Sequence, residues 1–92
     1  MIIAVDFDGT LANKGEPNIV LIKRLIAEQR RGNTVILWTC RQNQSLVDAL
    51  EFLARYGFRP NLVNRNTPEI VRRQGDSRKI YADIYIDDKA VR

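Results

Sequence analysis

The stretch Met1-Ile-Ile-Ala-Val-Asp-Phe-Asp-Gly-Thr-Leu-Ala12 decides the fold. Its apolar run from Ile2 to Val5 is uninterrupted, which is typical of a strand buried on both faces of a parallel sheet. The run ends at Asp6 and Asp8, which share one face of an extended backbone, and Gly9 then permits a sharp turn. Two carboxylates this close repel each other unless a cation or a proton lies between them. Because ligands of open α/β sheets bind at this end of a strand, the stretch predicts a metal-dependent acidic site.

The remainder of the chain alternates between helical and extended patterns. Further strands are expected at 34–38, 60–63 and 82–86, and helices at about 17–31, 45–56 and 67–74. Residues 11–16 are expected to form a polar connection, and Ser45 is expected to cap the second helix with Asp48 completing a capping box. This order predicts a single α/β domain over residues 1–92, a Rossmann-like three-layer domain with a short parallel sheet of about four strands.

Residues able to act on a phosphate follow three of the four predicted strands. They are Asp6 and Asp8 after the first, Thr39 after the second, and Asp87 with Asp88 after the fourth. The carboxyl ends of parallel strands lie along one edge, so these residues are expected to converge, and Lys79 is expected to reach the same edge. The chain contains no histidine and one cysteine, so a bound metal would have oxygen ligands, which points to Mg²⁺ or a similar hard cation.

This constellation resembles the four sequence motifs of the haloacid dehalogenase-like (HAD) superfamily, most members of which are magnesium-dependent phosphatases. The positions that fall on the motifs are, in order, Asp6 with Asp8, Thr39, Lys79, and Asp87 with Asp88. The resemblance implies that Thr39 and Lys79 hold phosphoryl oxygens. Arg78 remains the alternative to Lys79 as the basic phosphate contact.

The resemblance also implies a two-step mechanism and a metal site. Asp6 would attack phosphorus and form an aspartyl-phosphate, while Asp8 would protonate the leaving oxygen and later activate the hydrolytic water. One Mg²⁺ would bind the Asp6 and Asp87 carboxylates and the Asp8 backbone carbonyl, with Asp88 supporting the metal or its waters. Dehalogenase members lack the second aspartate, so Asp8 favours hydrolysis of a phosphate ester.

The expected substrate is a phosphorylated small molecule, whose identity the residues leave open. A nucleotide or nucleic-acid end phosphatase is permitted by the net charge of +4. Nucleic acid is not favoured, because no basic patch is interleaved with aromatic residues. A non-catalytic phosphate- or metal-binding module of the same fold is the alternative from another class. Cys40 is not expected to be a nucleophile, because the position that a cysteine phosphatase fills with arginine is Leu46.

The sequence also carries expectations about the surroundings of the site. The predicted elements fill both intervals between motifs where HAD proteins insert a cap domain, so a capless, open site is expected. Few residues follow Asp88, so the fifth strand of the usual HAD core is expected to be missing or supplied by a partner, for which a homo-oligomer is one remedy. The lone Cys40 and the short apolar runs predict a cytoplasmic protein without a membrane segment or secretory leader.

Overall fold

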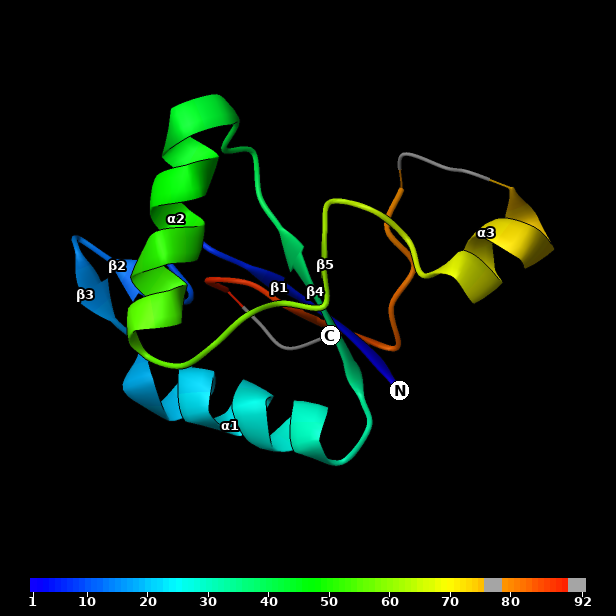
Figure 1. The fold of residues 1–92 in the computed structure, drawn as a ribbon, viewed down its shortest axis with the longest axis horizontal. Coiled ribbons are helices and arrows are strands. Elements are labelled where there is room, and N and C mark those ends of the chain that lie inside the picture. Colours follow the sequence, from blue (N-terminus) through cyan, green and yellow to red (C-terminus); the bar gives the residue numbers. More distant parts are fainter. Residues whose placement is uncertain (76–78, 90–92) are drawn as a thin grey trace.

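Four parallel strands form the central sheet in the order β5-β4-β1-β6. The computed structural model describes residues 1–75 and 79–89 of the chain (Figure 1). The two inner strands are β1 (Ile2–Asp6) and β4 (Thr34–Trp38), and the edges are β5 (Leu62–Val63) and β6 (Ile84–Ile86). The predicted Rossmann-like α/β fold with a four-stranded parallel sheet is confirmed.

The apolar runs of the inner strands follow from burial on both sides of the sheet. Ala4 and Val5 of β1 and Val35, Ile36 and Leu37 of β4 are all completely buried. Since neighbouring side chains on a strand point to opposite faces, a strand covered on both faces needs apolar residues at every position. The polar residues therefore begin only where the strands leave the core, at Asp6 and after Trp38, which are partners in the parallel register.

Helices α1 (Ile19–Arg30) and α2 (Asn43–Arg55) cover one face of the sheet, and α3 (Pro68–Gln74) lies on the other side (Figure 1). The larger core joins Ile22, Leu25, Leu53 and Phe58 to Val5, Leu37 and their neighbours on the sheet. A smaller core on the other face joins Ala4 and Ile36 to Ile80 and Ala82, which precede β6. Among the described residues, no helix is both long and apolar enough to cross a membrane.

The expected plain connection at residues 11–16 is instead a small hairpin. It consists of β2 (Ala12–Asn13) and β3 (Glu16–Pro17), which pair in antiparallel fashion. Lys14 and Gly15 between them have φ angles of 52° and 80°, and two positive values in a two-residue loop match the twist of a hairpin. The strand segments are too short for the alternation of apolar and polar residues to reveal them.

The second helix begins earlier than predicted, and Ser45 is not its cap. Helix α2 starts at Asn43 with Gln42 at the N-cap position, so Ser45 lies in its first turn. The Ser45 hydroxyl accepts from the Gln42 N–H at 3.2 Å and donates to the Gln42 carbonyl at 2.9 Å. Asp48 instead accepts from the Gln44 side chain at 2.9 Å, so it does not complete a capping box.

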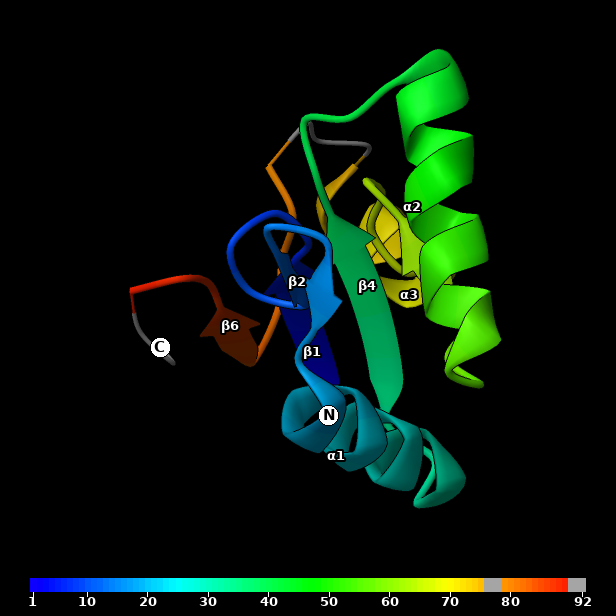
Figure 2. The same cartoon turned by 90° about the vertical axis from the view of Figure 1, so that its left-hand side faces the viewer.

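The two edge strands are shorter than predicted because side chains replace part of their backbone pairing. The Asn61 Oδ1 accepts from the Val35 N–H at 2.8 Å, immediately before β5. The Asp83 Oδ2 accepts from the Ile2 N–H at 2.7 Å, immediately before β6. Figure 2 shows β6, β1 and β4 side by side, with β6 at the edge of the sheet. Both side chains fix the edge strands at the end of the sheet opposite the predicted site.

Candidate active site

The carboxyl ends of β1, β4 and β6 bring most of the predicted site residues together. A hollow of ≈ 240 Å³ is lined by Asp6, Trp38, Thr39, Cys40, Asp87 and Asp88. Asp6 ends β1, Thr39 follows β4, and Asp87 follows β6, so three strands supply its walls. The convergence expected from parallel pairing is therefore observed for Asp6, Thr39, Asp87 and Asp88.

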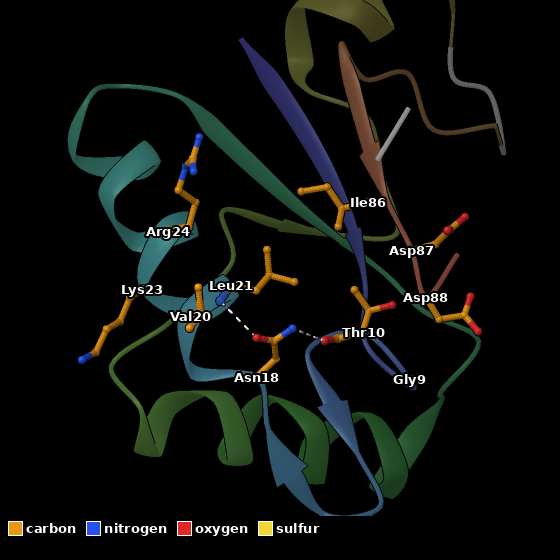
Figure 3. Close-up of a pocket in the computed structure, with 10 residues that line it drawn as sticks. All are labelled: Gly9, Thr10, Asn18, Val20, Leu21, Lys23, Arg24, Ile86, Asp87 and Asp88. Atoms are coloured by element: carbon orange, nitrogen blue, oxygen red, sulfur yellow. Dashed lines mark hydrogen bonds between the residues drawn. The ribbon is translucent and has the colours of Figure 1, made fainter. Parts of the chain in front are cut away.

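The turn after β1 touches the acidic loop after β6, and Gly9 makes this approach possible. Gly9 has a φ of +81°, which side chains rarely tolerate. A Cβ atom at this position would lie 3.3 Å from the Asp88 Cβ and 3.7 Å from its Oδ2. Figure 3 shows Gly9 and Thr10 beside Asp87 and Asp88. A glycine is thus required both by the backbone conformation and by the proximity of Asp88.

Replacing this glycine is expected to destabilise the fold and displace Asp88. Gly15 has nearly the same φ of +80°, but no atom lies within 4 Å of its hypothetical Cβ. Gly15→Ala should therefore cost only the left-handed strain, about 1–2 kcal/mol. Gly9→Ala should lower the melting temperature by several degrees more, because a contact with Asp88 is added to the same strain. Equal melting temperatures for the two variants would show that this contact imposes no constraint.

The same turn is tied to the start of α1. Asn18 is the N-cap of α1: its Oδ1 accepts from the Leu21 N–H at 3.2 Å, and its Nδ2 donates to the Thr10 carbonyl at 3.2 Å (Figure 3). A larger hollow of ≈ 640 Å³ lies there, lined by residues of the turn, of α1 and of the end of β6. Thr10 is buried and its hydroxyl has no partner among the described residues. Asn18 thus fixes the position of the turn that carries Asp8 and Gly9.

Burial and neighbouring negative charges both raise the pKa of the Asp6 carboxyl group. It is half-buried, and burial is the largest cause that raises its pKa above the usual value. The negative charges of Asp8, Asp88 and Asp87 raise this pKa further. The Phe7 N–H opposes them by donating to the Asp6 Oδ1 at 2.9 Å. A cation among these carboxylates would relieve the repulsion and favour the ionised form of Asp6.

Asp8 lies outside this hollow and is paired with a residue that sequence reasoning missed. Its Oδ1 is 2.8 Å from the Arg41 Nη2 and its Oδ2 is 3.0 Å from the Arg41 Nε. This two-pronged hydrogen bonding lowers the pKa of Asp8. Arg41 is further held by the Ser45 carbonyl, which accepts from its Nη1 at 3.1 Å. The sequence did offer one signal for Arg41, namely its position two residues beyond Thr39, at the end of the same strand.

Thr39 is buried and is held by a second residue that sequence reasoning missed. The Thr39 N–H donates to the Asn64 Oδ1 at 2.8 Å, and the Asn64 Nδ2 donates to the Thr39 carbonyl at 2.9 Å. The Thr39 Oγ1 accepts from the Arg41 N–H at 3.1 Å. Asn64 follows β5 with a φ of 52°, a conformation that asparagine adopts more readily than most residues. The side-chain amide therefore joins the ends of β4 and β5.

Lys79 is exposed and is not among the residues that line the hollow around Asp6. The segment that carries it is fixed by Asn66, which is buried. The Asn66 Nδ2 donates to the Lys79 carbonyl at 3.0 Å, and its Oδ1 accepts from the Tyr81 N–H at 2.6 Å. Arg78 lies outside the described residues. The role of a basic residue from this segment stays a prediction.

The donor set fits a hard cation that keeps part of its water shell. Within residues 1–75 and 79–89, no three acidic, histidine or cysteine side chains are grouped closely enough to hold a metal by themselves. Mg²⁺ usually binds through only one or two carboxylates, with waters and substrate oxygens completing its shell. The Asp6, Asp87 and Asp88 carboxylates around one hollow match that chemistry.

Comparison with known proteins places the chain in a family. No family model matches the chain, and no curated protein matches it either. A solved structure of a conserved protein from Bacteroides thetaiotaomicron superposes with a TM-score of 0.83 and shares 36% sequence identity. The similarity covers 98% of this chain and 77% of that chain. The chain belongs to the same family as that Bacteroides protein.

Proposed function

We propose that this family member is a capless magnesium-dependent phosphatase of the HAD type, which hydrolyses a phosphate monoester through an aspartyl-phosphate intermediate. The observation that carries the proposal is the shared hollow of Asp6, Thr39, Asp87 and Asp88 at the ends of three parallel strands. Carboxylates that repel one another beside a buried hydroxyl are suited to a cation and a phosphoryl group. The order of these residues along the chain is that of the HAD motifs.

In this proposal the two acids of the first turn have different roles. An Asp6 oxygen forms a bond to phosphorus while the bond to the leaving oxygen breaks, and that oxygen receives a proton from Asp8. Asp8 then takes a proton from the water that hydrolyses the aspartyl-phosphate. The half-buried position of Asp6 beside the hollow suits the nucleophile. The exposed Asp8 can act as the acid once it separates from Arg41, whose hydrogen bonds lower its pKa, and takes up a proton from solvent.

The remaining residues would bind the metal ion and position the phosphoryl group. Asp6, Asp87 and the Asp8 carbonyl would hold Mg²⁺, with Asp88 supporting it or its waters. Bound there, Mg²⁺ would neutralise charge on the phosphoryl oxygens and on the acids. The Thr39 hydroxyl, which accepts from the Arg41 N–H, still has its own proton to donate to a phosphoryl oxygen. Lys79 would contact another phosphoryl oxygen.

The direct test is hydrolysis of p-nitrophenyl phosphate by the purified protein, with Mg²⁺ or with a chelator. We expect turnover that depends on Mg²⁺, together with a phosphorylated protein trapped by rapid acid quenching and detected by mass spectrometry. Phosphate release without any phosphorylated protein would contradict the aspartyl-phosphate. Binding of Mg²⁺ without any turnover would favour the non-catalytic module.

The role given to Asn64 is testable by a matched pair of variants. Asn64→Ala removes the amide that holds both the N–H and the carbonyl of Thr39, so we expect a loss of turnover of about 10-fold or more, the size of effect that misplacing a substrate-holding group produces. Asn61→Ala removes one side-chain hydrogen bond to the backbone, accepted from the Val35 N–H, at the opposite end of the sheet. It should lower stability but leave kcat/KM close to the wild-type value. Equal losses of kcat/KM in both variants, measured well below their melting temperatures, would contradict the positioning role.

A further inference from the structure

A second hollow, of ≈ 430 Å³, is lined by Asp8 and by Phe7, the residue that follows Asp6, but not by Asp6 itself. Its other lining residues include the cationic residues Lys14, Arg41 and Arg55 and a second aromatic residue, Phe52. The volume lies within the range of about 300–1,000 Å³ that is usual for small-molecule sites. The residue proposed to protonate the leaving oxygen therefore faces a space large enough for a small organic group.

The walls of this hollow combine flat apolar surfaces with positive charge. The rings of Phe7 and Phe52 meet edge to face with centroids 5.8 Å apart. The Arg41 guanidinium carbon lies 4.8 Å from the centroid of the Phe7 ring. Arg41 thus lies over an aromatic face within the range of a cation–π contact, and this contact restrains its side chain beside the hollow.

The structure already shows what this guanidinium binds. Arg41 holds the Asp8 carboxylate through two nitrogens, the arrangement in which arginine recognises carboxylate and phosphate groups. The other lining carboxylate, Asp48, accepts from the Gln44 amide at 2.9 Å. The two carboxylates do not balance the three cations, so the hollow keeps an excess of positive charge. The hollow around Asp6 has the opposite character, since three acids line it.

We propose that the second hollow is the leaving-group subsite, and that the preferred substrates are small phosphate monoesters whose leaving group carries a second anionic group bound by Arg41. This inference rests on the proposed phosphatase function. When such a group enters, Arg41 exchanges the Asp8 carboxylate for the anion of the substrate. Asp8, released from the guanidinium that held it ionised, takes a proton from solvent and passes it to the leaving oxygen as the bond to phosphorus breaks. Lys14 and Arg55 add to the positive charge around the bound anion. Arg41 is therefore a specificity-determining residue.

Two aryl phosphates of almost identical shape test the proposal. 4-Carboxyphenyl phosphate has an anionic leaving group, and 4-carbamoylphenyl phosphate has a neutral one. We expect the wild-type protein with Mg²⁺ to show a kcat/KM at least 10-fold higher for the carboxylate. Arg41→Gln should remove this preference. Arg30→Gln, the same change at an exposed arginine of α1 that does not line the hollow, should keep it.

The outcomes separate this inference from the proposed function. Equal kcat/KM values for the two esters in the wild-type protein would overturn the anionic subsite and leave the phosphatase intact. If neither ester is hydrolysed, the phosphatase fails, and calorimetric titration with 4-hydroxybenzoate and 4-hydroxybenzamide decides the subsite. Tighter binding of 4-hydroxybenzoate that is lost in Arg41→Gln but kept in Arg30→Gln would support an anion site, and equal binding of both compounds would overturn it.

Discussion

Asp6→Asn is expected to reduce phosphatase turnover on the order of 10⁴-fold or more, the size of loss seen when a nucleophile is removed from a group of residues that act together. The asparagine Oδ1 can still accept from the Phe7 N–H, so the local geometry should be kept. Asp8→Asn should retain a covalent intermediate but slow its formation by about 10²–10⁴-fold, because a general acid is lost. The first effect is measured as kcat with p-nitrophenyl phosphate and Mg²⁺. The second is measured with an alkyl phosphate and Mg²⁺, because an alkoxide needs a proton to leave, whereas p-nitrophenolate does not.

Asp83→Asn is the matched control for Asp6→Asn. Asp83 is an exposed aspartate that accepts from the Ile2 N–H at the opposite end of the sheet, and asparagine can make the same hydrogen bond. Its turnover should stay close to the wild-type value. Near-normal turnover in Asp6→Asn would rule out the covalent mechanism.

Magnesium is expected to raise the melting temperature strongly. A ligand that binds only the folded protein adds about 2.7 kcal/mol at a concentration of 100 times its Kd. For a domain of this size each kcal/mol corresponds to about 4–8 °C, so thermal unfolding with saturating Mg²⁺ and with chelator should differ by more than 10 °C. Asp87→Asn should remove much of this difference, while Asp83→Asn should keep it. Identical melting temperatures in Mg²⁺ and chelator would contradict the metal site.

The chelated protein provides an independent check on the crowding of the acids. Folding raises the pKa of Asp6, so its unfavourable contribution is fully present above that raised pKa and disappears as the pH falls through it. At neutral pH in chelator, Asp6→Asn should therefore melt a few degrees higher than the wild type. In saturating Mg²⁺ the order should reverse, because the variant has lost a ligand.

The parts of the fold that follow from continuous burial were predictable from the sequence. The uninterrupted apolar runs of β1 and β4 can be buried on both faces only at the centre of the sheet. The ends of these two strands then fix where Asp6 and Thr39 lie. Parallel pairing then brings Asp87 and Asp88 to the same edge without any knowledge of side-chain contacts. The acidic half of the candidate site depends only on these features.

The features of the site that the sequence did not predict depend on polar side chains. These side chains bind the backbone or the charged group of a residue that lies far away in the chain. Asn64 reaches Thr39 across 25 positions of the chain, and Arg41 reaches Asp8 across 33. The position of Arg41 just beyond a strand end hinted at a role, but neither contact partner could be read from the local sequence, because an arginine or a loop asparagine looks the same in sequence whichever distant residue it binds. The short hairpin was missed because each of its strands has two residues, fewer than any periodic pattern needs.

The pairing of β6 with β1 joins nearly the two extremes of the described chain, since Ile3 lies opposite Ile84. Contacts between residues so distant in sequence form late, because closing a long loop costs entropy before any contact compensates for it. β6 is also a three-residue edge strand whose side chains are only partly buried, so it belongs to the class of segments that open first in native-state hydrogen exchange. Such an opening would carry Asp87 and Asp88 away from Asp6 while the core beneath α1 and α2 stayed folded. A cation bound between Asp6 and Asp87, as proposed, would therefore link the docking of the last strand to the completion of the site, and the protein should then acquire its metal affinity only in the final step of folding.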